Sequence, residues 1–382
     1  MDYTNEKFSF KIKKVLRYLK LYGPFRTFIK IKGQLHMNKS YISLPKNQLN
    51  ERIKSHIGIL GAGNFSYSNL SYYLRKNYGK VIRGVMDIEI NRAASLFEKY
   101  DLIYYTDNAS DIINDDHIDL VYIASNHFTH AEYAIQALVK GKSVHIEKPH
   151  VVNRDQLDRL VRAMKQSEGK VMLGFNRPGS RFGRIILEYI KKETGPIMIN
   201  WFIAGHAIDP EHWYFNEAEG GRILGNLCHW TDFTYQMITS ESRYPIRIVP
   251  SRSKKADCDI SVTYIFGDGS IATITFSAKG HTFEGVREKL NAHKGNVLIS
   301  MDDYEKLTID VIDKKKVFRN AFRDHGHELN VKHSYEMISK NADGESIKYI
   351  YETADLFLKT KESLESQKEI IVQPYELSIN TK

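Results

Sequence analysis

The chain has 382 residues, 42% of them hydrophobic and 26% charged, which is typical of a folded protein with two domains. Its two cysteines, Cys228 and Cys258, are too few for a disulfide framework and lack metal-ligand spacing, so we expect a cytoplasmic protein without a metal site. No apolar run approaches the roughly 18 residues that cross a bilayer.

The formal charge of +9 is concentrated at the N-terminus. Residues 1–52 hold nine lysines and three arginines against three acidic residues, whereas the rest of the chain is electrically balanced. A neutral body without a basic, aromatic-rich surface disfavours nucleic-acid binding.

Residues 1–52 are expected to form a basic amphipathic arm. One apolar stripe at helical spacing consists of Ile12, Val15, Leu16 and Leu19. Gly23-Pro24 breaks this helix, and a second amphipathic piece begins at Phe25. The stripe suits packing on the protein body or another subunit, which we favour, or contact with an anionic membrane surface at its inner face.

Residues 53–175 alternate short apolar strands with helices. Strands are expected at 57–60, 81–87, 119–125, 142–149 and 170–176, and helices after the first strand and at 90–100, 129–141 and 154–169. This alternation predicts a doubly wound parallel sheet, a dinucleotide-binding domain of the Rossmann type.

Residues 176–382 follow another pattern. Helices are expected at 181–194, 222–239, 328–340 and 349–366, and a strand at 197–205. Strand-like runs without intervening helices occupy the region from 246 to 313, with a hairpin turn at Asp268-Gly269. These features predict an α/β domain with a mostly antiparallel open sheet.

The stretch GILGAGNFS, residues 58–66, has the strand–turn–helix context of a dinucleotide site. Gly61 permits the tight turn, Gly63 lets the backbone approach a pyrophosphate, and Ser66 is small where a third glycine is usual. Asp87 ends the second strand, where a carboxylate accepts ribose hydroxyls and repels a 2′-phosphate. The pattern predicts NAD and favours it over NADP.

Four motifs follow one another between residues 53 and 375. They are GILGAGNFS (58–66), IASNHFTHAEYAIQALVKGKSVHIEKP (123–149), GFNRPGSR (174–181) and GGRILGNLCHWTD (220–232). Together they resemble the Gfo/Idh/MocA oxidoreductases, the glucose-fructose oxidoreductase and inositol dehydrogenase group. The resemblance implies a Rossmann domain followed by an α/β domain with an open antiparallel sheet.

The resemblance also implies roles for particular residues. Lys148 is expected to meet the substrate oxygen, His229 to act as general acid/base, and Asp232 to hold the tautomer of His229. The expected cofactor contacts are Gly61, Ala62, Gly63, Asn64, Phe65, Asp87, Ser125, Asn126, His127, His130, Glu147 and Lys148. The expected substrate contacts are Asn176, Arg177, Arg181, His212, Trp213 and Asn226.

One position departs from the family pattern. Gly225 stands where most members carry a carboxylate, four residues before His229. Three hypotheses stay open. The first is an NAD-dependent sugar or nucleotide-sugar dehydrogenase, and the second is an NAD-retaining glycosidase, a class that the resemblance includes. The third, suggested by Gly225, is a binding or scaffold protein with impaired chemistry.

Residues 14–37 and 228–233 further resemble bi-domain oxidoreductases of bacterial surface-polysaccharide loci. That resemblance favours a sugar or nucleotide-sugar substrate in polysaccharide synthesis. We also expect a homo-oligomer, a dimer or tetramer formed through the C-terminal sheet. The arm is expected to make a membrane or protein contact, and its deletion to leave NAD affinity intact.

Overall fold

The computed structural model describes residues 6–48, 55–205, 208, 211–254, 259–279 and 283–375. Cys258 and the expected boundary at residues 52 and 53 lie outside these ranges. The chain forms two compact units, residues 1–179 with 326–345 (unit 1) and residues 180–325 with 346–382 (unit 2). The arm helix and a late helix thus both belong to unit 1.

Unit 1 contains a six-stranded parallel sheet in the order β3-β2-β1-β4-β5-β6. Its strands are β1 (Ile57–Leu60), β2 (Ile82–Met86), β3 (Tyr104–Thr106), β4 (Leu120–Ile123), β5 (Ser143–Ile146) and β6 (Val171–Leu173). This strand order is that of the doubly wound dinucleotide-binding fold, so the predicted Rossmann domain is confirmed. β1 and β4 are buried along their whole length, as their unbroken apolar runs predict.

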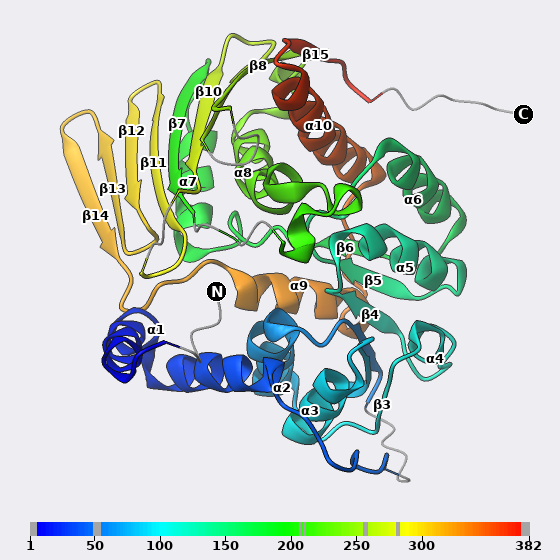
Figure 1. The fold of residues 1–382 in the computed structure, drawn as a ribbon. Coiled ribbons are helices and arrows are strands. Elements are labelled where there is room, and N and C mark those ends of the chain that lie inside the picture. Colours follow the sequence, from blue (N-terminus) through cyan, green and yellow to red (C-terminus); the bar gives the residue numbers. More distant parts are fainter. Residues whose placement is uncertain are drawn as a thin grey trace, which may run out of the picture. The chain divides into compact units, whose positions relative to one another are not determined.

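Helices cover both faces of this sheet (Figure 1). They are the π-helical segment η2 (Ser66–Leu70), α2 (Ser71–Tyr78), α3 (Ile90–Tyr100), α4 (Ala109–Ile113), α5 (His127–Val139), α6 (Arg154–Gln166) and α9 (His327–Ser339). α9 returns from late in the chain to pack on β5 and β6 beside α2. The Tyr122 hydroxyl donates to the Val331 carbonyl over 3.0 Å, which ties α9 to the middle of the sheet.

The arm forms one long helical element, α1 (Phe8–Met37), that is kinked at Gly23. Gly23 has φ 75° and ψ 170°, so the predicted break is confirmed and divides α1 into two limbs. The predicted apolar stripe is largely exposed on unit 1, since Leu16 is 61% and Ile12 is 44% exposed. The stripe is thus not buried on the body of this chain, and the other expected contacts, with another subunit or a membrane surface, stay predictions.

Unit 2 is built on a nine-stranded sheet in the order β14-β13-β12-β11-β7-β10-β9-β8-β15. The strands are β7 (Ile197–Ala204), β8 (Ile246–Arg252), β9 (Ile260–Ile265), β10 (Ile271–Ser277), β11 (Arg287–Lys294), β12 (Val297–Asp302), β13 (Lys306–Val311), β14 (Lys314–Arg319) and β15 (Ile370–Val372). β7 and β10 pair in parallel, and the other pairings described are antiparallel. The predicted mostly antiparallel sheet is confirmed.

The longer helices of unit 2 are α7 (Arg181–Lys191), α8 (Cys228–Met237) and α10 (Ile347–Ser366). Short helical turns are η3 (Trp213–Phe215), η4 (Glu217–Glu219), η5 (Ile223–Leu227) and η6 (Ser240–Ser242). β7 alternates buried and exposed residues along its length, so one face of the sheet meets the core and the other does not.

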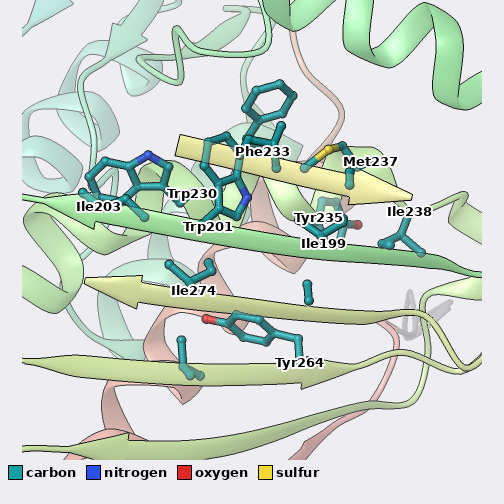
Figure 2. Close-up of a cluster of buried hydrophobic side chains, with 14 of the residues drawn as sticks. Ile199, Trp201, Ile203, Trp230, Phe233, Tyr235, Met237, Ile238, Tyr264 and Ile274 are labelled. Atoms are coloured by element: carbon teal, nitrogen blue, oxygen red, sulfur yellow. The ribbon is translucent and has the colours of Figure 1, made fainter. Parts of the chain in front are cut away.

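The core of unit 2 lies between the sheet and α8 (Figure 2). Trp201 of β7 and Trp230 and Phe233 of α8 are almost completely buried there. The Trp230 indole donates to a Glu288 carboxylate oxygen over 2.7 Å, so burial of this ring leaves its polar atom satisfied. This packing fixes the first turn of α8, which carries His229.

Candidate active site

The glycine turn after β1 has the backbone conformation that the sequence predicts. Gly61 has φ 96°, and a Cβ built there would lie 2.5 Å from the Ala124 carbonyl oxygen, so only glycine fits. The Ser66 hydroxyl donates to the Gly61 carbonyl over 2.5 Å. Ser66 thus stands where a third glycine is usual, and its completely buried side chain bonds back to the first glycine of the turn.

Gly63 differs from Gly61 because the protein itself does not require it. A Cβ built on Gly63 would meet nothing within 4 Å. The turn lies at the start of a helix, where backbone N–H groups favour an anion. Space kept open over such a turn fits the pyrophosphate of a dinucleotide, because that group needs close approach to the backbone.

Asp87, directly after β2, holds the turn from the side. One carboxylate oxygen accepts from the Ala62 amide over 2.7 Å, and the other accepts from the Glu89 amide over 2.9 Å. Burial raises the pKa of Asp87, an effect that these two amide donors oppose. Each oxygen retains a second lone pair, so the carboxylate can also accept ribose hydroxyls.

The second limb of α1 braces the same turn from the opposite side. His36 is 2% exposed, its Nε2 lies 2.6 Å from the Ala62 carbonyl oxygen, and its ring stacks on Tyr67 at 4.3 Å. A Cβ on Gly33 would collide with the Asn64 side chain, so the limb approaches the turn as closely as glycine allows. The second limb thus contacts the cofactor turn directly, and the expectation that deleting the arm leaves NAD affinity intact stays a prediction.

The protonation state of His36 follows from these contacts. A carbonyl accepts only, so Nε2 carries the hydrogen, and the buried Nδ1 has no hydrogen-bond partner among the described residues. Burial lowers the pKa of His36 to about 4, helped by the positive charges of Arg92 and Lys39. The ring is therefore neutral near pH 7.

His130 joins the loops that follow β4 and β5. Its Nδ1 lies 2.8 Å from the Pro149 carbonyl oxygen and its Nε2 lies 3.1 Å from the Ser125 carbonyl oxygen. Burial lowers the pKa of His130, so the ring is neutral and donates to one of these carbonyls at a time. Because Pro149 follows Lys148, this contact positions the loop that carries the expected catalytic lysine.

Glu147 is also held by the protein rather than exposed for chemistry. It is 8% exposed, and one carboxylate oxygen lies 3.3 Å from Nε2 of His145. His145 in turn lies 2.7 Å from the Ser334 hydroxyl of α9. A Cβ on Gly174 would lie 2.7 Å from the Glu147 carboxyl carbon, so the glycine of GFNRPGSR makes room for this carboxylate.

The other expected cofactor residues lie on the same edge of the sheet. Asn126 precedes the first turn of α5 and His127 begins it, with the His127 side chain 4% exposed. Phe65 follows the glycine turn and meets the His327 ring edge-on at 5.5 Å. Lys148 is half-buried. Structure thus gathers Gly61, Asp87, Ser125 and Lys148 at the carboxyl ends of β1, β2, β4 and β5.

The expected substrate residues divide between the units. Asn176 and Arg177 are buried in unit 1, and the Asn176 amide nitrogen lies 3.4 Å from Nε2 of His327. Arg181 begins α7 in unit 2, where its guanidinium donates to the Arg319 carbonyl and to Asn320. Those bonds link the start of α7 to residues 319 and 320, and a role of Arg181 in substrate binding stays a prediction.

His212 and Trp213 lie in unit 2 at η3. Nδ1 of the exposed His212 accepts from the Tyr214 amide over 3.3 Å, which caps the short helix. Trp213 packs against Tyr214 with ring centroids 5.3 Å apart. This aromatic pair forms part of a loop whose residues 209 and 210 lie outside the described ranges.

His229 stands in the first turn of α8 and is 8% exposed. Asn226 and Gly225 belong to the preceding π-helical turn η5. Asp232 is 0% exposed, and its carboxylate accepts from Tyr349, Thr353 and Gln236. Burial raises the pKa of Asp232 to about 7. These partners leave Asp232 without a bond to His229, so the expected role of Asp232 in fixing the His229 tautomer is wrong. Asp232 instead links α8 to α10.

Sequence reasoning missed His36 and His145. His36 falls in the segment 14–37 and His145 in the motif at 123–149, but neither was given a role, because each acts through a partner distant in the chain. His36 falls beyond the apolar stripe of the arm, and His145 lies inside a strand whose apolar run masks it. Spacing along the sequence carries no signal for such contacts.

Comparisons with known proteins agree with this geometry. Residues 55–175 match the Gfo/Idh/MocA family model, an oxidoreductase family with an NAD-binding Rossmann fold. An oxidoreductase from Formosa agariphila is 32% identical over 217 residues, which are 48% of this chain and 67% of that protein. An inositol 2-dehydrogenase from Salmonella paratyphi B is 30% identical over 185 residues, 42% of this chain and 54% of the relative.

Solved structures share the fold. Levoglucosan dehydrogenase in complex with NADH and L-sorbose has a TM-score of 0.73 at 16% identity, covering 84% of this chain and 99% of that one. GenD2 from gentamicin A biosynthesis, in complex with NAD, has a TM-score of 0.71 at 14% identity, covering 87% and 100%. Identities this low establish a common fold and leave the substrate open.

Gly63→Ala separates ligand binding from folding. We expect its free energy of unfolding to stay within about 1 kcal/mol of wild type, because the added methyl meets no protein atom. NADH affinity should fall by about tenfold or more, because the methyl occupies the pyrophosphate approach. Urea denaturation and NADH fluorescence titration measure the two effects. Undiminished NADH affinity would show that the open space is not the cofactor site.

Gly61→Ala is the matched comparison for that variant. It should lose several kcal/mol of stability, since the methyl meets the Ala124 carbonyl at a positive φ.

The docking of α1 should weaken in acid. The pKa of His36 in the folded protein lies below the ordinary value of 6.5. The stability that the neutral ring contributes to the docked helix is therefore complete above pH 6.5 and is lost as pH falls toward 4. At pH 5 the loss is about 2 kcal/mol. Hydrogen–deuterium exchange of residues 25–37, corrected for intrinsic rates, should therefore quicken between pH 7 and pH 5.

His36→Gln is the control, because the glutamine amide can donate to the Ala62 carbonyl without titrating. Its exchange should change little with pH, and an acid response equal to that of wild type would assign the effect to another group.

Proposed function

The chain belongs to the Gfo/Idh/MocA family of NAD-binding Rossmann oxidoreductases, and we propose that it transfers hydride between NAD and a hydroxyl or keto carbon of a sugar or nucleotide sugar. One observation carries this proposal: the open turn at Gly63, the carboxylate of Asp87 and the loop of Lys148 lie at the carboxyl edge of one parallel sheet. Ligands bind at that edge in doubly wound folds.

The names of the relatives support a polyol or sugar substrate, because they include dehydrogenases of inositol and levoglucosan. The likeness of residues 14–37 and 228–233 to bi-domain oxidoreductases supports a place in surface-polysaccharide synthesis. A cytoplasmic location accords with a content of only two cysteines, Cys228 and Cys258. Among the described residues, no helix is sufficiently long and apolar to span a bilayer.

The bound nicotinamide would accept or supply the hydride. Lys148 would orient the substrate oxygen and stabilise the negative charge that develops there when the C–H bond breaks. His130 and Glu147 act as positioning residues, because one holds the loop at Pro149 and the other lies beside the Lys148 amide at 3.4 Å.

The proton of the substrate hydroxyl needs an acceptor. Gly225 offers no carboxylate, Asp232 is bonded to three partners on α8 and α10, and Glu288 accepts from Trp230. As the family resemblance implies, we propose that His229 accepts this proton, while the Lys148 ammonium stabilises the alkoxide that results. Because Gly225 supplies no carboxylate, experiments must also exclude two other functions, an NAD-retaining glycosidase and a binding protein.

The exposed face of the nine-stranded sheet is the proposed homo-oligomer interface. Ile271, Met198, His293 and Leu298 lie side by side across β10, β7, β11 and β12. Met198 is 65% and Leu298 50% exposed, and apolar patches of this kind mark interaction surfaces. Met198→Lys should lower the sedimentation coefficient, whereas a wild-type monomer would contradict the proposal.

The exposed side of α1 is the proposed membrane or protein contact. Phe8 is 77% and Leu16 is 61% exposed on a limb that also carries Lys13 and Arg17. Apolar and basic side chains together favour an anionic surface.

Lys148→Met tests the proposed chemistry. A panel of sugars and nucleotide sugars would be screened with NAD for NADH formation. On an active substrate, kcat should fall about 1,000-fold while the dissociation constant of NADH changes less than about threefold. Lys140→Met, an exposed lysine just after α5, is the control and should keep full activity.

Three outcomes discriminate among the hypotheses. Full turnover by the Lys148 variant would contradict the assigned role. Cleavage of a glycoside without NADH accumulation would identify the glycosidase. Absence of both reactions, with NADH and sugar still bound, would identify a binding protein.

A further inference from the structure

A hydrogen-bonded chain runs through the interior of unit 1, from α9 to the loop that carries Lys148. His145 in β5 is 1% exposed, its Nδ1 lies 2.7 Å from the Ser334 hydroxyl, and its Nε2 lies 3.3 Å from a Glu147 carboxylate oxygen. The second carboxylate oxygen of Glu147 accepts from the Lys148 amide over 3.4 Å. Buried polar groups are costly without partners, so these contacts explain how a histidine is accommodated inside a buried strand.

Ser334 decides which ring nitrogen of His145 carries the hydrogen. An ionised carboxylate only accepts, so Nε2 carries the hydrogen that meets Glu147. Nδ1 then accepts, and the donor beside it is the Ser334 hydroxyl. The Asn330 carbonyl, at 3.1 Å, is the other acceptor within reach of that hydroxyl and lies farther away than Nδ1. Because the tautomer of a histidine is set by the bond that its other nitrogen makes, a residue of α9 determines the donor that β5 presents to Glu147.

The Glu147 carboxylate is confined as well as bonded. Glu147 is 8% exposed, and a Cβ built on Gly174 would lie 2.7 Å from its carboxyl carbon and from one of its oxygens. Gly174 directly follows β6, so the carboxylate occupies the space beside the carboxyl ends of β5 and β6. The His145 donor fixes the side chain in this space, and the Lys148 amide ties the start of the loop to it.

We propose that His145 and Ser334 are positioning residues for Lys148, an inference that rests on the proposed dehydrogenase function. Ser334 orients His145, His145 holds the Glu147 carboxylate, and that carboxylate holds the amide of the residue that meets the substrate oxygen. A group that acts on a substrate gains from such support, because a misplacement of about 1 Å can lower the rate about 100-fold.

A second histidine of unit 1 offers a matched comparison. His56, just before β1, has its Nε2 3.1 Å from the Tyr335 hydroxyl of α9, so it also links the sheet to that helix. It stands at the amino end of its strand, whereas Glu147 and Lys148 follow the carboxyl end of β5. Replacing either histidine by leucine removes one link to α9, but only the His145 variant releases Glu147.

Hydrogen–deuterium exchange of the full chain, without NAD or substrate, tests the positioning whatever reaction the chain catalyses. In His145→Leu, the amides of Lys148 and of residues 150–152 should exchange at least about tenfold faster than in wild type, whereas in His56→Leu they should stay within about twofold. Equal acceleration in both variants, or none in His145→Leu, would overturn the proposal.

Two further variants separate the hydrogen bond from the packing around it. His145→Gln places an amide donor near the position of Nε2 and should return exchange to within about threefold of wild type. Exchange as fast as in His145→Leu would instead assign the effect to packing and contradict the proposal. Gly174→Ala keeps the histidine while its methyl displaces the Glu147 carboxylate, so exchange should rise as in His145→Leu. Wild-type exchange in that variant would show that Glu147 does not hold the loop.

Turnover then links the positioning to the proposed chemistry. On a sugar that the wild-type chain oxidises, His145→Leu and Ser334→Ala should lower kcat about tenfold or more, with KM and the dissociation constant of NADH within about threefold of wild type. His145→Gln should regain most of kcat. A wild-type kcat in His145→Leu would overturn the inference, even with a loosened loop. If the wild-type chain oxidises no sugar, that result contradicts the proposed function, and the exchange experiment still decides whether His145 and Glu147 hold the loop.

Discussion

The carboxylate of Asp87 is the constraint on which the proposed site depends. It accepts the amide of Ala62 in the glycine turn and the amide of Glu89 beyond β2, and so couples two neighbouring strand ends. Burial raises the pKa of this group, and the two amide bonds oppose that rise by stabilising the charged carboxylate. In the proposed site the same negative charge would accept ribose hydroxyls and disfavour a 2′-phosphate, which links the local geometry to the choice of cofactor.

Around that carboxylate, the turn is held from three directions. Ser66 closes it from within, and His36 reaches the Ala62 carbonyl from the arm. Over Gly63 the turn is open, because a Cβ built there would meet no protein atom within 4 Å. The arm thus divides into two parts. Its second limb packs against the turn, while its first limb exposes apolar and basic residues.

The sequence predicts features that depend on local patterns and misses those that depend on contacts between distant segments of the chain. The expected helix at 90–100 matches α3 residue for residue, because apolar periodicity is local. β3 and α4 were missed since three and five residues are too few to show a period. Motifs located Gly61 and Lys148, and the end of the second expected strand located Asp87. The placement of α9 on β5, the His36 contact and the true partners of Asp232 depend on distant segments, and no local pattern encodes them.

The most direct test of this account is the relative affinity of the full chain for NADH and NADPH, measured by fluorescence titration at one salt concentration. If the Asp87 carboxylate both holds the turn and faces the ribose, NADH should bind about tenfold or more tightly than NADPH, and Asp87→Asn should narrow that ratio while weakening NADH. Equal affinities, or tighter binding of NADPH by the wild-type chain, would contradict it.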